Sequence, residues 1–229
     1  MSQLILIRHG QSVYNQQNLF TGWSDVDLSE QGRAEAKAAG ELLLHHKIYP
    51  DICFTSWLKR AIHTADIVLQ ILEWEHIDAI RSYKLNERHY GAWQGRDKKE
   101  VEKEYGEEAF LAVRRGYDVA PPKLKTDDPR VVKNDKKYAT LPKELLPLSE
   151  SLQDTKKRVV AYYEATIKPE LLKGKKVFIS AHGNSLRALV MYLEQISPED
   201  VVNLEIPTGE IYHYAFDEKL HITTKEVLL

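Results

Sequence analysis

Two histidine–glycine pairs are the residues best suited to chemistry, because each directly follows a short apolar run. His9 lies in Arg8-His9-Gly10 after the apolar run 4–7, and His182 lies in His182-Gly183-Asn184 after the run 177–181. A neutral imidazole is a good nucleophile near neutral pH and can hold a phosphoryl group covalently. Glycine after each histidine lets the backbone approach a ligand closely. We therefore predict transfer of a phosphoryl group through a phosphohistidine, and we assign the group to His9.

Cations and an acid–base group suited to phosphoryl transfer occur nearby. A transferring phosphoryl group spreads negative charge over its oxygens, so its site needs donors and cations already in place. Arg8 adjoins His9, and Arg60 lies in the first turn of a predicted helix, where backbone N–H groups also favour anions. Further candidates lie in a charged segment: Arg88, Arg114 and Arg115. Glu87 is the natural group to exchange a proton with a substrate hydroxyl.

Other site types lack support. The sequence contains no Gly-x-x-x-x-Gly-Lys-Ser/Thr loop, no zinc spacing of Cys and His, and no Gly-x-Ser-x-Gly elbow. His45 and His46 are adjacent and point to different helix faces, so we interpret them as surface residues and predict no metal site. His63 follows Arg60 by three residues, and substrate contact and structural packing are equally compatible with that spacing.

Composition indicates a soluble globular protein. The chain has 229 residues, 43% of them hydrophobic, which fits a single domain over 1–229 with an insert at about 86–140. Its 32 basic and 34 acidic residues give a net charge of −2, which favours neither nucleic acid nor an anionic membrane as partner. The one cysteine, Cys53, lies in a predicted buried strand and excludes an internal disulfide. We expect a cytoplasmic protein, because no signal peptide or run of roughly 18 apolar residues is found.

The hydrophobic pattern predicts strands that alternate with helices. Strands are predicted at 4–7, 51–55, 77–80, 177–181, 211–216 and 221–227, and helices at 30–45, 58–72, 98–115, 152–167 and 186–193. Ser29 is the predicted N-cap of the helix 30–45, after a loop at 18–27. This order predicts an α/β fold with a mostly parallel sheet, helices on both faces, and a charged insert covering the C-terminal ends of the strands. Ligands bind at those ends in such sheets.

Many segments look like blocks of one family: Leu6–Ser12, Phe20–Trp23, Asp27–Glu30, Leu58–Thr64, Leu85–Ala92, Arg114-Arg115, Ser149–Leu152, Ser180–Ala188 and Ile206–Gly209. On these blocks, the sequence resembles the cofactor-dependent phosphoglycerate mutases of the histidine phosphatase superfamily over nearly its whole length. Arg-His-Gly marks only the superfamily, whereas the Asn-Glu-Arg-His-Tyr-Gly block with the paired arginines is more specific to the mutases.

The resemblance implies a glycolytic reaction, the interconversion of 3-phosphoglycerate and 2-phosphoglycerate, primed by 2,3-bisphosphoglycerate as cofactor and without a metal. It implies that His9 carries the phosphoryl group, that Arg8, Arg60 and His182 hold it, and that Glu87 exchanges the proton. The implied phosphoglycerate-binding residues are Ser12, Asn15, Thr21, Gly22, Arg88, Tyr90, Lys98, Arg114, Arg115, Gly183 and Asn184. Relatives range from monomers to tetramers, and we expect a homodimer.

Three alternatives stay open at this point. A phosphatase of the same superfamily would pass the group from His9 to water, but it has no need of the insert's cations to grip a small dianionic carboxylate. A bisphosphoglycerate synthase is disfavoured by Ser12, since such relatives tend to have glycine there. A non-catalytic domain that binds phospho-ligands would be expected to lack one of His9, Glu87 and His182. Two departures stand out: Gln11 replaces a common glutamate, and longer relatives have a C-terminal tail that helps exclude water.

Overall fold

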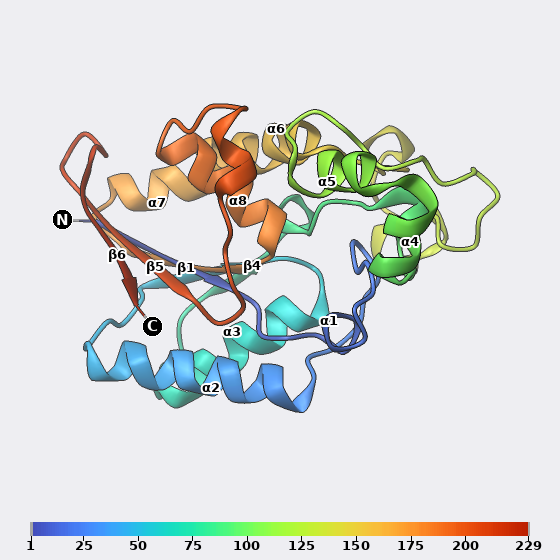
Figure 1. The fold of residues 1–229 in the computed structure, drawn as a ribbon. Helices are drawn as coiled ribbons and strands as arrows, with labels where there is room; N and C mark the ends of the chain where they lie inside the picture. Colours follow the sequence, from blue (N-terminus) through green and yellow to red (C-terminus); the bar gives the residue numbers. More distant parts are fainter. Residues whose placement is uncertain (1, 229) are drawn as a thin grey trace.

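One sheet of six strands forms the centre of the computed structural model, which describes residues 2–228 (Figure 1). The strand order is β3-β2-β4-β1-β5-β6. Strands β1 to β4 pair in parallel, whereas β5 and β6 are antiparallel to their neighbours. The strands are Gln3–Arg8 (β1), Ile52–Thr55 (β2), Ala79–Arg81 (β3), Lys176–Ala181 (β4), Ile211–Phe216 (β5) and Ile222–Leu228 (β6). The predicted mostly parallel α/β sheet is thus confirmed.

Helices cover both faces of this sheet (Figure 1). Ile5 and Ile7 of β1 pack with Val68 on the face covered by α2 and α3, whereas Leu4 and Leu6 enter the core beneath α6 and α8. This alternation follows from the two-residue period of a strand. The helices are Val13–Gln16 (α1), Glu30–His45 (α2), Lys59–Ile71 (α3), Lys98–Tyr105 (α4), Glu107–Arg115 (α5), Leu152–Tyr162 (α6), Lys168–Leu172 (α7) and Gly183–Leu193 (α8).

The N-terminus of α2 is capped by the residue next to it in the sequence, whereas that of α3 is capped by a tertiary contact. Ser29 is the N-cap of α2, as predicted, and its hydroxyl accepts the N–H of Gly32 at 3.1 Å. Leu58 has no side chain that can cap α3. The carboxylate of Asp25 accepts the N–H of Lys59 instead, at 2.8 Å. A cap satisfies one of the otherwise unpaired N–H groups of a helix, so this contact also ties the loop before α2 to α3.

Some predicted boundaries are wrong. The helix predicted over 98–115 is two helices, because Gly106 has φ +83°, a conformation that favours glycine and stops α4. The helix predicted over 152–167 ends at Tyr162 and continues as a π-helical turn, Tyr163–Ile167. The helix predicted from residue 186 begins at Gly183, since its first turn is polar and gives no apolar period. Short α1 was not predicted.

The segment 86–140 lies beyond the carboxyl ends of β1 and β4 and carries α4 and α5 (Figure 1). Phe20 from the loop after α1 packs with Trp93, Val101 and Phe110 of this segment, with all four side chains buried. The predicted cover over the strand ends is therefore confirmed. No helix within residues 2–228 is long and apolar enough to cross a membrane.

Candidate active site

His9 and His182 lie side by side because β1 and β4 are neighbouring parallel strands. Arg8 is paired with Ala181 in the sheet register, and the N–H of His9 donates to the Ala181 carbonyl at 2.9 Å. The two imidazole rings follow directly, with centroids 5.0 Å apart and planes at 64°. The sheet register thus brings the two histidines into the facing arrangement expected for neighbouring strands.

The imidazole of His9 is oriented and electrostatically prepared to act as a nucleophile. Its Nδ1 lies 2.6 Å from the carbonyl oxygen of Gly10, which can only accept, so Nδ1 carries the proton and Nε2 keeps the lone pair. Burial, reinforced by the charges of Arg60 and Arg8, holds the pKa of His9 well below its usual value. The ring is therefore neutral at physiological pH, and its Nε2 accepts a hydrogen bond from Nε of Arg60 at 3.2 Å.

His182 offers a hydrogen-bond donor next to His9. Ser56 Oγ accepts the N–H of Leu58 at 3.1 Å, and its own proton can go to Nε2 of His182, 2.8 Å away. That leaves the proton of His182 on Nδ1, which has no hydrogen-bond partner in the described chain. Burial and the charge of Arg60 lower the pKa of His182 well below its usual value. A buried donor without a partner is costly, so this atom is available to a ligand.

Arg60 is held rigidly beside His9. Its side chain is fully buried, and its terminal nitrogens donate to the carbonyls of Ser24 at 2.9 Å and Gly22 at 2.8 Å. Burial lowers the pKa of Arg60 to about 10, so the guanidinium stays charged at neutral pH. It can therefore stabilise negative charge that develops next to His9 Nε2 without first having to reorganise.

The carboxylate of Glu87 is fixed by backbone donors. Its Oε1 accepts the N–H of Arg88 at 2.7 Å and that of Asn184, in the first turn of α8, at 3.0 Å. The other oxygen, Oε2, has only a longer contact of 3.4 Å to the same Asn184 N–H. A Cβ on Gly183 would stand 3.6 Å from Oε2 and 3.5 Å from Cζ of Arg8, so glycine here leaves the space between acid and guanidinium open. Oε2 is thus free to exchange a proton.

A cavity of about 250 Å³ opens onto these groups. Its lining includes thirteen of the predicted site residues: Arg8, His9, Asn15, Thr21, Gly22, Arg60, Glu87, Tyr90, Lys98, Arg114, Arg115, Gly183 and Asn184. The lining cations outnumber its two carboxylates, Glu87 and Glu205, and Glu205 is already paired with Arg115. Burial and the charge of Arg114 lower the pKa of Lys98. Nε of Arg8 and Oγ1 of Thr21 have no partner in the described chain, and both suit an anionic ligand.

Three predicted residues are not among those that line the cavity: Ser12, Arg88 and His182, whose ring centroid lies 5.0 Å from that of His9. Ser12 is the N-cap of α1 and exchanges hydrogen bonds with Asn15, which does line the cavity. Arg88 is fully buried, stacks 4.6 Å from the ring centroid of Tyr90 and donates to its hydroxyl at 3.1 Å. The side chains of Ser12 and Arg88 therefore position Asn15 and Tyr90, which line the cavity and can reach a ligand.

The sequence prediction missed six lining residues: Leu19, Phe20, Arg187, Glu205, Ile206 and Pro207. Arg187 had a detectable signal, because it follows Gly183 by four residues and so shares its helix face. It donates to Oδ1 of Asn184 at 2.9 Å. Glu205 had no local signal; it pairs with Arg115 and precedes Ile206 and Pro207, which also line the cavity. His63 is not among the lining residues and instead pairs with Asp27 at 2.6 Å.

Comparison with known proteins identifies the class first. The sequence profile of the histidine phosphatase superfamily (branch 1) matches residues 4–134 and 125–224, so the chain belongs to that superfamily. Within it, the chain is 50% identical to the 2,3-bisphosphoglycerate-dependent phosphoglycerate mutase of Lachnoclostridium phytofermentans, over 99% of this chain and 91% of that protein. It is also 50% identical to the 2,3-bisphosphoglycerate-dependent phosphoglycerate mutase 2 of Lactiplantibacillus plantarum, over 100% and 99% of the two chains. The chain is a member of this mutase family.

Solved structures agree on the fold. The structure titled Mycobacterial hydrolase 1 superposes with a TM-score of 0.74 at 23% identity, covering 99% of this chain and 97% of that one. A mycobacterial glucosyl-3-phosphoglycerate phosphatase superposes with a TM-score of 0.71 at 25% identity, covering 98% and 96%. The predicted membership of the family and the predicted fold are both confirmed.

Proposed function

We propose that the chain interconverts 3-phosphoglycerate and 2-phosphoglycerate through a phosphohistidine on His9, as an intramolecular phosphotransferase of the isomerase class. The observation that carries this proposal is a neutral His9, with Nε2 presented to a cavity rich in cations, next to a carboxylate able to exchange a proton. The names of relatives at about 50% identity over the full chain support the same reaction.

Each transfer is an in-line exchange at phosphorus between His9 and a substrate oxygen. In one direction, Nε2 of phosphorylated His9 is the leaving group: the P–N bond breaks as the substrate hydroxyl oxygen forms its P–O bond, and Glu87 takes the hydroxyl proton. In the other, the lone pair of Nε2 forms the P–N bond, the P–O bond breaks, and Glu87 returns the proton to the departing oxygen. Arg8, Arg60 and Nδ1–H of His182 stabilise the charge on the phosphoryl oxygens in both directions.

Residues of the insert give a reason for the substrate to stay bound between the two transfers. Three cations that line the cavity come from α4 and α5 rather than from β1, which carries His9: Lys98, Arg114 and Arg115. They can hold a carboxylate. Tyr90 hydroxyl accepts hydrogen bonds from Arg88 and Asn184, both at 3.1 Å, so its own proton remains to be donated. This retention distinguishes a mutase from a phosphatase, which releases the dephosphorylated product after one transfer.

The residues present fit 2,3-bisphosphoglycerate as the priming cofactor. When bound, this molecule supplies the phosphoryl group that first loads His9. The excess of cations in the lining and the unpartnered donors of Arg8 and Thr21 suit a ligand that carries several negative charges. Residues 2–228 contain no group of three or more His, Cys, Asp or Glu side chains positioned to hold a metal ion.

The experiment that tests this function is a coupled mutase assay with 3-phosphoglycerate on fully dephosphorylated enzyme, with and without 2,3-bisphosphoglycerate. We expect turnover to 2-phosphoglycerate that depends on the primer. Release of inorganic phosphate without 2-phosphoglycerate would favour the phosphatase, and binding without turnover would favour a non-catalytic domain.

The proposal also includes one domain and a homodimer in the cytoplasm, on the strength of the family resemblance. Native mass spectrometry at micromolar concentration tests the dimer, and a monomer under those conditions would contradict it.

A further inference from the structure

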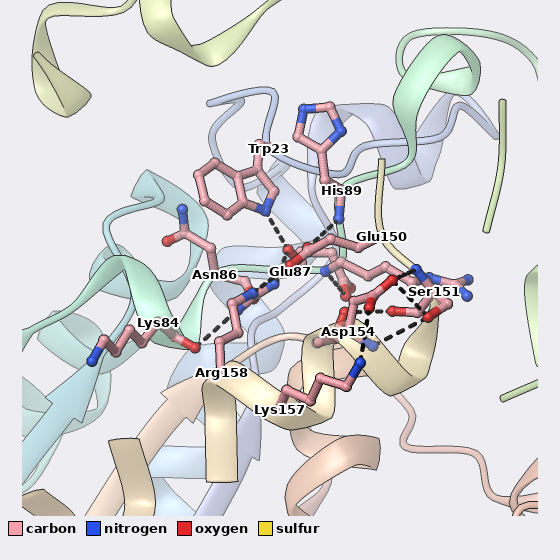
Figure 2. Close-up of polar contacts among 12 residues, drawn as sticks. Trp23, Lys84, Asn86, Glu87, His89, Glu150, Ser151, Asp154, Lys157 and Arg158 are labelled. Carbon is pink, nitrogen blue, oxygen red and sulfur yellow. Dashed lines mark hydrogen bonds and ion pairs between the residues drawn. The ribbon is translucent and has the colours of Figure 1, made fainter. Parts of the chain in front are cut away.

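An arginine outside the cavity, Arg158 of α6, makes five hydrogen bonds near Glu87. Its guanidinium donates to the carbonyls of Lys84 at 2.9 Å, Asn86 at 2.8 Å and Glu87 at 2.8 Å. It also forms a two-bond pair with Glu150, at 2.7 and 2.9 Å. Figure 2 shows Arg158 rising from its helix between these carbonyls and Glu150. Arg158 is not among the residues that line the cavity.

Regular structure fixes little of the segment that Arg158 contacts. Lys84 lies in the 3₁₀ turn Tyr83–Leu85, but residues 86–89 belong to no helix or strand, so the carbonyls of Asn86 and Glu87 have no partners in a helix or a sheet ladder. A buried carbonyl needs a hydrogen-bond donor, and Arg158 supplies one to each carbonyl it reaches in this segment. Nε1 of Trp23 adds a second donor to the carbonyl of Glu87, at 2.5 Å. The position of the Glu87 backbone is therefore set by side chains.

Glu150 holds the backbone on the C-terminal side of Glu87. One of its oxygens accepts the N–H of His89 at 2.8 Å, while its own N–H donates to the His89 carbonyl at 2.9 Å. The side chain of Glu150 is only 6% exposed, and that of Arg158 is 14% exposed. The Arg158–Glu150 pair thus holds the backbone at Asn86 and Glu87 and, two residues further on, at His89 (Figure 2).

From these contacts we infer that Arg158, with Glu150, is a positioning residue that sets where the carboxylate of Glu87 stands relative to the substrate oxygen. This inference rests on the proposed function, because Glu87 matters there as the proton donor and acceptor. Proton transfer requires a donor within hydrogen-bond reach of the reacting oxygen, so a shift of about 1 Å in the Glu87 backbone can cost about 10²-fold in rate.

The test is a double-mutant cycle with the full chain, comparing wild type, Arg158→Met, Glu87→Gln and the double variant in the primed mutase assay. Arg158→Met should lower kcat about 10²-fold while the KM for 3-phosphoglycerate changes less than about threefold, because Arg158 does not line the cavity. In the Glu87→Gln background, the same change should cost less than about threefold, because a misplaced glutamine has no proton transfer left to lose.

A second variant and a control protect the test against misfolding. Arg158→Met leaves Glu150 buried without its cation, which lowers stability. Arg158→Lys keeps the charge but cannot reach all of the carbonyls at once, so it should fold and lose about tenfold in kcat. Arg130→Met is the matched control: Arg130 also pairs with a carboxylate, Asp128, and donates to the Gln94 carbonyl at 2.7 Å, but it does not touch 84–87. It should keep kcat.

The possible results separate the positioning role of Arg158 from the proposed mutase function. A loss that multiplies with that of Glu87→Gln, or a rise in KM at unchanged kcat, would overturn the positioning role while primed mutase activity of the wild type stands. If Arg158→Met does not fold, the cycle with Arg158→Lys decides by the same criterion. A wild-type enzyme without mutase activity would overturn the proposed function and this inference together.

Discussion

Replacing Glu87 with glutamine isolates the proton transfer from the rest of the site. The carbonyl oxygen of the new amide can still accept the N–H groups of Arg88 and Asn184, which Oε1 of the native side chain accepts at 2.7 and 3.0 Å. The amide nitrogen then takes the place of Oε2, where even a Cβ added to Gly183 would stand 3.6 Å away, so the nitrogen has room. Glu87→Gln therefore keeps the shape of the site and the hydrogen bonds to Oε1, and loses the carboxylate's ability to exchange a proton together with its negative charge.

The expected loss follows from that single change. A positioned acid or base typically contributes about 10²–10⁴-fold, so kcat should fall by that factor, or about 2.7–5.4 kcal/mol in activation free energy. The KM should not rise, because the change also removes a negative charge from a cavity built for an anion. The loss should appear in the loading of His9 as well as in turnover, since both steps protonate or deprotonate a substrate oxygen.

The assay is steady-state mutase activity with saturating primer, together with single-turnover loading of His9. Glu104→Gln is the control, because that carboxylate is exposed and pairs with Arg96 far from His9 in sequence. A Glu87→Gln enzyme with kcat within about threefold of wild type would refute the assignment of the acid and base. A large loss in the control would show that the effect is not specific to Glu87.

The remaining predictions concern the phosphoryl pocket, the packing behind it and the response to pH. Arg60→Lys keeps the charge but loses the planar fork that joins His9 to the carbonyl of Gly22, so kcat should fall about 10²–10³-fold; unchanged kcat in the mutase assay would contradict this. Gly10→Ala would put a Cβ 2.1 Å from the carbonyl oxygen of Gly32, a backbone atom in α2; thermal unfolding should show a loss of about 1–3 kcal/mol, and an unchanged melting temperature would argue against this close approach. Burial lowers the pKa of four histidines: His9, His89 (to about 4), His182 and His213. Because the unfolded chain takes up protons on these imidazoles below about pH 6.5 and the folded chain does not, the free energy of unfolding should fall as pH drops below that value, by up to about 1.4 kcal/mol per pH unit for each histidine. Urea denaturation between about pH 7 and pH 5 measures this, and a constant midpoint would contradict it.

The parts of the fold that the sequence predicts well are those whose period comes from burial. Alternate residues of β1 enter two different cores, and α3 presents Ala65, Val68 and Leu69 to one of them, so both elements are legible in the sequence. Cys53 is buried as predicted, and burial raises the pKa of its thiol to about 12. The missed helix boundaries lie where the apolar period gives no information: in the polar first turn of α8, and at Gly106, where the backbone conformation ends α4.

The same division applies to the candidate site. His9 and His182 are predictable, because strand ends are visible in the sequence and parallel neighbours bring their ends together. Arg158 is not, because the carbonyls that it contacts lie 71 to 74 positions earlier in the chain and its own helix gives it no special pattern. Glu205 is likewise paired with a residue distant in the chain, Arg115. Side chains that act through tertiary hydrogen bonds leave no mark that spacing alone can reveal.

The central claim is that His9 carries the phosphoryl group, and the most direct test is to find the group on that residue. Dephosphorylated enzyme would be incubated with 2,3-bisphosphoglycerate, quenched in alkali, where phosphohistidine persists, and digested for peptide mass spectrometry. The account predicts a phosphoryl group on Nε2 of His9 that disappears when 3-phosphoglycerate is added before the quench, and no loading in His9→Ala. Loading at another residue, or a phosphoryl group on His9 that 3-phosphoglycerate does not remove, would contradict it.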